Sequence, residues 1–134
     1  MDWGYHELLI GHSLFRWVVL ACMLAQALWI ARHSYLNSTF SKVHFVMLCC
    51  FTAIYNIQLI LGLTLYFHSP LVQAFWSAIP AGIKHRQLRF FGMEHITMMC
   101  LAVAFINYYT LKASYKIDHQ RVFTFLGKRY IWIF

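Results

Sequence analysis

Three long apolar stretches dominate the chain, and shorter segments richer in polar residues separate them. The stretches cover residues 8–31, 43–67 and 90–111, and no proline interrupts any of them. A helix that crosses a bilayer needs about 20 predominantly apolar residues, so each stretch is long enough. In lipid every backbone N–H and C=O must be satisfied within the chain, which favours helices. The pattern therefore predicts an all-α integral membrane bundle with three transmembrane helices.

The loop between the second and third stretches, residues 68–89, has a pattern of its own. Two prolines break it, and apolar residues recur there at roughly helical spacing, namely Leu71, Val72, Phe75, Trp76 and Ile79. Such spacing predicts a short helix that lies flat in the membrane interface.

The C-terminal tail, residues 112–134, is apolar in two places that are both too short to cross a membrane. Residues 122–126 and 130–134 are apolar, and a Gly-Lys-Arg sequence separates them. We expect this interfacial tail to lie along the cytoplasmic surface or to dock on a partner.

The composition agrees with one membrane domain, residues 1–134. Hydrophobic residues make up 61% of the chain, aromatic residues 19% and charged residues 11%. Soluble domains are typically about 45–50% apolar and about 25% charged, so a water-soluble globular protein is excluded. A disordered chain is excluded as well, because disorder needs few aromatic residues and a high charge density.

The positions of Lys and Arg predict the orientation in the membrane. The end that carries the tail has seven of these cations and the opposite end has four. This difference places the N-terminus outside and the C-terminus in the cytoplasm. Because the cations lie between apolar runs and not on one face, the net charge of +7 indicates contact with membrane lipids and no nucleic-acid partner.

Ionisable residues within the apolar stretches are costly to insert, so each needs a reason. His12 lies four residues into the first stretch and His95 five residues into the third, which gives depths of about 6 and about 7.5 Å from the same side. Two imidazoles at one depth can bind the iron of a haem from both sides. Arg16, one helical turn from His12, is then the partner of a haem propionate. Glu94 is expected to orient a histidine or to take part in proton movement.

Two other arrangements of these residues remain open at this point. Arg16 and Glu94 can form an ion pair between helices, with His12 and His95 as hydrogen-bonding residues. Alternatively, His12, Glu94 and His95 can bind a metal ion directly.

The remaining polar residues carry weaker signals. His44 has no obvious partner at its depth in the second stretch. Asn56, Gln58 and Asn107 are uncharged, and packing between helices is their default role, with contact to a quinone or lipid as the alternative.

Several short sequences resemble those of a known family. They are His-Ser-Leu-Phe-Arg-Trp at 12–17, Gln-Leu-Ile-Leu-Gly-Leu-Thr-Leu-Tyr-Phe at 58–67 with Ser-Pro at 69–70, and Arg-Phe-Phe-Gly-Met-Glu-His at 89–95 with Met-Met at 98–99. In order and spacing they resemble a family of small bacterial four-helix membrane proteins labelled cytochrome b or cytochrome-b-like. The resemblance covers roughly residues 6–112.

The resemblance implies a bundle in the bacterial inner membrane whose histidines hold haem b, with His12, Arg16, Glu94 and His95 at motif positions. The chain departs from the family where Asn56 and Asn107 stand in place of frequent histidines. If the family has two haem sites, we expect the inner one to be lost here. The fourth helix is also replaced by the split tail, which leaves one flank of the bundle open for a partner subunit.

Two functions follow as expectations. The first is a cytochrome-b-like subunit of a respiratory or other redox complex, with haem b between the first and third helices and electron exchange with quinol. The second is a non-catalytic accessory subunit that has lost its cofactor and stabilises a larger membrane complex. No nucleophile–base arrangement, phosphate-binding loop or carboxylate pair is present in the sequence, so we expect no independent catalytic activity.

Overall fold

The computed structural model describes residues 3–115 and 122–130, and all regular structure in these residues is helical. The long elements are α1 (Trp3–Tyr35), α2 (Lys42–His68) and a continuous helical segment made of α5 (Arg86–Arg89), the π-helical turn η1 (Phe90–Glu94) and α6 (His95–Ser114). The short helices are α3 (Pro70–Ser77), α4 (Ile79–Gly82) and α7 (Val122–Tyr130).

Three helical segments are long and apolar enough to cross a membrane: Gly4–Tyr35, Lys42–His68 and Arg86–Ser114. They contain the predicted stretches and extend the first and third by three or four residues at each end and the second by one residue at each end. Few of their side chains are buried within the chain, and large apolar residues such as Leu14, Leu24 and Met98 are exposed. Soluble proteins rarely expose apolar surface on this scale, so these faces are suited to lipid.

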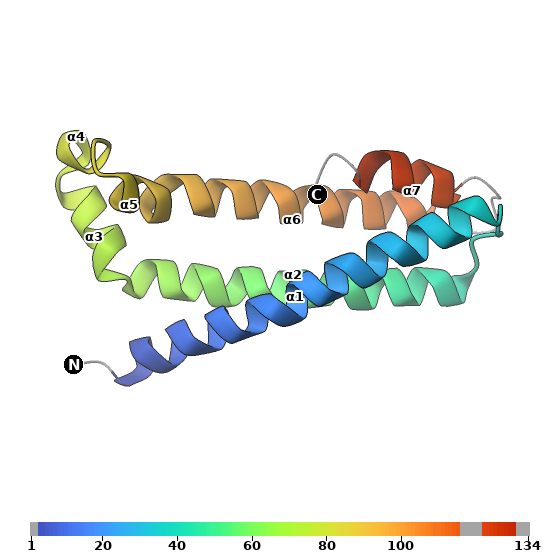
Figure 1. Cartoon of the computed structure of the whole chain (residues 1–134), viewed down its shortest axis with the longest axis horizontal. Coiled ribbons are helices and arrows are strands. Elements are labelled where there is room, and N and C mark those ends of the chain that lie inside the picture. Colours follow the sequence, from blue (N-terminus) through green and yellow to red (C-terminus); the bar gives the residue numbers. More distant parts are fainter. Residues whose placement is uncertain (1–2, 116–121, 131–134) are drawn as a thin grey trace.

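Helix α2 lies at the centre of the bundle, with α1 packed on one side and α6 on another. Figure 1 shows α1 crossing α2 at an angle, so that the first half of α1 diverges from α6. The main apolar core lies toward the opposite end of the bundle and includes Ile30, Leu48, Ile106, Phe123 and Leu126. The end that holds the start of α1 is therefore the more loosely packed one.

Hydrogen bonds between polar side chains connect α2 to both neighbours. Tyr55 donates to the side-chain oxygen of Gln26 on α1 at 2.6 Å, and both residues are buried. The hydroxyls of Thr52 and Thr110, the latter on α6, lie 2.8 Å apart. Because lipid offers no competing hydrogen-bond partners, such pairs specify which faces of the helices meet.

The tail differs from expectation because α7 docks on its own chain. Figure 1 shows α7 running back alongside α1 and α6. Val122, Phe123 and Leu126 are buried there, and the Thr124 and Ser34 hydroxyls are 3.4 Å apart. The first apolar part of the tail, residues 122–126, which we expected on the membrane surface or on a partner, thus packs against α1 and α6 of its own chain. Residues 116–121 and 131–134 lie outside the described residues.

The short helix predicted in the loop 68–89 is present as α3. Its buried residues, Val72 and Phe75, face the bundle, and Phe75 packs against Gly92 in the π-helical turn. Tyr66 donates a hydrogen bond to the Gly92 carbonyl at 2.8 Å and accepts one from Trp76 Nε1 at 2.8 Å. These contacts tie α2 and α3 to the turn that precedes α6.

We expect Gly92→Ala to destabilise the bundle, because the new Cβ would overlap the Phe75 ring. Overpacking of this kind typically costs about 1–3 kcal/mol. Thermal unfolding in detergent, followed by circular dichroism, measures the loss. Gly4→Ala is the control, since a Cβ there meets nothing within 4 Å. Equal unfolding temperatures for both variants would contradict the packing described.

Candidate functional site

His12 lies on the face of α1 that meets α2, and its ring rests over Gly62. A Cβ at position 62 would lie 3.0 Å from His12 Cε1, which is closer than ordinary van der Waals contact. One turn earlier on α2, Gln58 Nε2 donates to the His12 carbonyl at 3.1 Å. Glycine at 62 therefore leaves the space that the imidazole occupies, and Gln58 holds the two helices together beside it.

The polar atoms around His12 are not all satisfied. His12 Nδ1 and Gln58 Oε1 are buried and have no hydrogen-bond partner in the part of the chain that the structure describes. Buried polar atoms nearly always have a partner in folded proteins. An unpartnered imidazole nitrogen at this position is thus a candidate for a ligand.

His95 begins α6, directly after the π-helical turn, and is half-buried. Its ring is tilted against Phe90 with the ring centroids 5.5 Å apart. His12 and His95 are within electrostatic range of each other, although α1 and α6 pack chiefly on α2.

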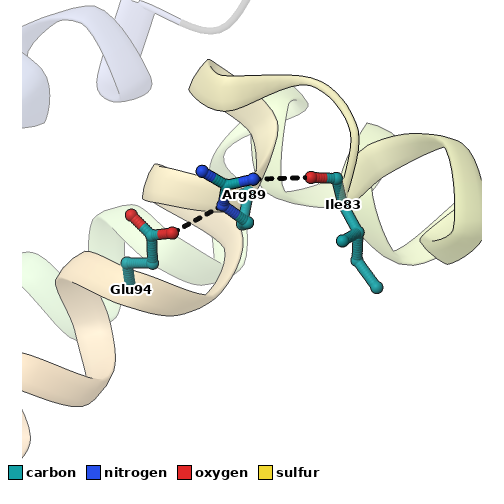
Figure 2. Close-up of polar contacts among 3 residues, drawn as sticks. All are labelled: Ile83, Arg89 and Glu94. Atoms are coloured by element: carbon teal, nitrogen blue, oxygen red, sulfur yellow. Dashed lines mark hydrogen bonds and ion pairs between the residues drawn. The ribbon is translucent and has the colours of Figure 1, made fainter.

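Glu94 forms an ion pair with Arg89, shown in Figure 2. Among residues 3–115 and 122–130 no second ion pair is found. Arg89 Nε donates to Glu94 Oε1 at 2.6 Å, and Arg89 Nη1 donates to the Ile83 carbonyl at 3.0 Å. The two residues are five apart, a spacing that a π-helical turn aligns and an α-helix does not. The sequence left open an ion pair between Arg16 and Glu94, and this pair is not formed.

Arg16 is exposed on α1, one turn after His12, and its guanidinium lies over the Trp17 ring at 5.2 Å from the centroid. Within the described residues, no three His, Cys, Asp or Glu side chains come together as a metal-binding group. A three-ligand metal site made by His12, Glu94 and His95 is accordingly not formed by the chain. A site with His12 and His95 as two ligands and Arg16 nearby stays a prediction.

The uncharged polar residues connect helices, as expected. Asn56 and Asn107 donate to each other reciprocally, with both N–O distances 3.1 Å. Each amide also donates to the carbonyl four residues earlier in its own helix, at 2.8 Å. The two asparagines are thus fully engaged in packing α2 against α6.

The structure also brings together a second pair of histidines, which the sequence did not predict. The His33 and His44 ring centroids are 4.8 Å apart, so the expectation that His44 has no partner at its depth is wrong. The signal was available, because His33 lies near the end of α1, His44 near the start of α2, and a short loop joins the two helices. A short connection brings such residues to one level.

Comparison with protein-family models, curated protein sequences and solved structures gives no significant match. The geometry of the two histidine pairs is therefore the basis for assigning a function.

We expect Gly62→Ala to displace the His12 ring and to destabilise the α1–α2 packing by about 1 kcal/mol, the lower end of overpacking costs. Ring nuclear magnetic resonance (NMR) signals of His12 measure the displacement, and thermal unfolding measures the stability. The matched control is Gly11→Ala, next to His12, where a Cβ meets nothing within 4 Å. A Gly62→Ala variant with unchanged His12 signals would show that the ring does not depend on this glycine.

Proposed function

We propose that this protein is a cytochrome-b-like membrane subunit that binds one haem b between α1 and α6 and passes electrons to or from quinol. The observation that carries the proposal is the position of His12: its ring lies over a glycine, has a buried nitrogen without a partner, and interacts electrostatically with His95. His12 and His95 are the residues that would hold the haem iron.

The residues around this pair suit haem b. Gly62 keeps side-chain bulk on α2 away from the His12 ring. Arg16 is exposed and forms no ion pair among the described residues. Its guanidinium lies over the Trp17 ring, and the N–H donors at its edge are available to a propionate. Glu94 precedes His95 in the sequence, and its ion pair with Arg89 holds it in place. Haem, when bound, supplies the one-electron chemistry, and the protein supplies ligands and burial.

A single haem is proposed because the two residues at the position of a second, inner haem site pack against each other. Asn56 and Asn107 bond directly to each other and to their own helices. Their amides hold α2 and α6 together at the level where the resemblance implies an inner site. This arrangement supports loss of that site in this chain.

The proposed setting is a bacterial inner membrane, with the N-terminus outside and larger integral membrane subunits and lipids as partners. The chain is an electron-transfer subunit and has no independent catalytic activity. Quinone is a second proposed ligand, as the electron donor or acceptor.

The alternative is a non-catalytic accessory subunit that stabilises a larger complex. The observation that favours it is the direct pairing in the middle of the bundle, where Gln26 bonds Tyr55 and Thr52 bonds Thr110 without any cofactor. A bundle that is held by its own side chains can serve as a packing element.

A reduced-minus-oxidised absorption spectrum of the purified full-length protein tests the proposal. We expect a Soret band and b-type bands, and we expect His95→Ala and His12→Ala to abolish them, because each removes an axial ligand. His68→Ala, which removes an exposed histidine hydrogen-bonded to Thr64, should keep the spectrum. A folded protein that stays colourless after haem is supplied would overturn the proposal and favour the accessory role.

The variant Arg16→Gln tests whether Arg16 binds a haem propionate or is only an exposed arginine. Removing a positive charge near haem makes electron uptake less favourable, so we expect the midpoint potential to fall while the b-type bands persist. Potentiometric titration measures the change. An unchanged potential would remove Arg16 from the proposed site.

A further inference from the structure

The His33–His44 pair lies in an aromatic enclosure at the opposite end of the bundle from His12. The imidazole planes are inclined by 64° at a centroid distance of 4.8 Å. Aromatic rings surround the pair, with centroid distances of 5.5 Å from Trp29 to His33, 6.0 Å from Phe40 to His44 and 5.2 Å from Phe123 to His44. Phe40 and Phe123 are fully buried, so neither imidazole is a simple surface group.

The hydrogen bonds of His44 require its neutral form. The Ser41 backbone N–H donates to His44 Nδ1 at 3.1 Å, so this nitrogen is an acceptor and carries no proton. The Ser41 hydroxyl lies 3.0 Å from the same atom. His44 is the third residue of α2 and in this way caps the start of the helix. A proton on Nδ1 would face the backbone N–H and break the cap.

His33 also has a ring nitrogen that its surroundings leave unpaired. Its Nδ1 is buried without a hydrogen-bond partner among the described residues. An N–H donor created there would have no acceptor, and an unsatisfied buried donor costs about 1–3 kcal/mol. The ring stacks on Phe123 of α7 with a centroid distance of 4.8 Å and an interplanar angle of 20°.

The same rings dock α7. Phe123 stacks on His33 and meets His44 edge-on at 5.2 Å. α7 has nine residues, and an isolated helix shorter than about 12–15 residues is marginal in water. Its position therefore depends on these contacts, together with buried Val122 and Leu126.

We propose that His33 and His44 form a proton-binding site that controls the docking of α7. His44 is neutral when α7 is docked, because its Nδ1 accepts the Ser41 backbone N–H. Proton uptake breaks the His44 cap or buries an unpaired donor on His33, and a second proton places two like charges side by side. Each event weakens the surface on which Phe123 rests and releases α7.

The other charged groups at this end reinforce the effect. His33 and His44 are close enough to interact electrostatically. Arg32 of α1, Lys42 of α2, and Lys128 and Arg129 of α7 are exposed cations, and Lys112 of α6 lies 4.7 Å from the Tyr108 ring centroid. The described carboxylates, Glu7 and Glu94, lie on segments at the other end of the bundle. No described acid at this end compensates the added positive charge.

The pH range follows from the neutral form required in the docked state. An imidazole in water has a pKa of about 6.5. Docking is therefore complete at higher pH, and its stability falls as the pH drops below that value. The site responds to mild acid, the range in which histidine switches operate.

Distances between two spin labels, measured by electron paramagnetic resonance in lipid nanodiscs, test the proposal. The labels are placed at Tyr35→Cys on α1 and Lys128→Cys on α7, both exposed positions, after the four native cysteines are replaced by alanine. We expect one short, narrow distance at about pH 7.5 and a loss of at least half of that population at about pH 5. An unchanged distribution at the lower pH overturns the proposal.

A matched variant removes titration and retains the contacts. His44→Gln keeps a side-chain acceptor for the Ser41 N–H at a position where glutamine is a common cap, and His33→Phe keeps the stack on Phe123. The double variant should stay docked at both pH values, whereas His68→Gln should behave as the native chain. Release of α7 in the double variant with the native pH midpoint overturns the proposal.

Histidine-ring NMR of the unlabelled native chain decides the case if the double variant is undocked throughout. The His33 and His44 signals are expected to titrate with the midpoint found for α7 release. A release midpoint that follows neither ring overturns the proposal.

Discussion

The hydrogen bonds that α2 makes on two of its sides are the interaction on which the bundle depends. Tyr55 reaches Gln26 of α1, and Thr52 and Asn56 reach Thr110 and Asn107 of α6. Each pair in a membrane protein is worth only about 0.6 kcal/mol on average. Their larger effect is to fix the rotation of each helix about its own axis, because an apolar helix in lipid has few other contacts that favour one face over another.

That choice of faces positions both histidine pairs. With Gln58 bonded to the His12 carbonyl, His12 is held over Gly62 and approaches His95. At the other end, the same α1–α2 packing brings His33 to His44, and α7 covers them. The proposed haem site lies in the half of α1 that diverges from α6 (Figure 1), and the proposed proton site lies toward the other end of α1, where α7 docks.

Much of the fold was predictable because its signals are local. Apolar length located the three spans, and helical spacing located α3. Helical rise predicted similar depths for His12 and His95. One alternative that the sequence left open, an ion pair between Arg16 and Glu94, is not formed, because Glu94 pairs with Arg89 across the five-residue π-helical turn. No composition or periodicity signal marks such a turn.

Residue order was thus sufficient to predict an all-helical chain with three helices long and apolar enough to cross a membrane, because a helix satisfies its backbone hydrogen bonds within one segment. The partners of the polar side chains came from the folded arrangement alone. The reciprocal bonds of Asn56 and Asn107, the His33–His44 contact and the docking of α7 all depend on helix rotation and crossing angle. Those quantities arise from packing between segments far apart in the chain, which local pattern does not encode.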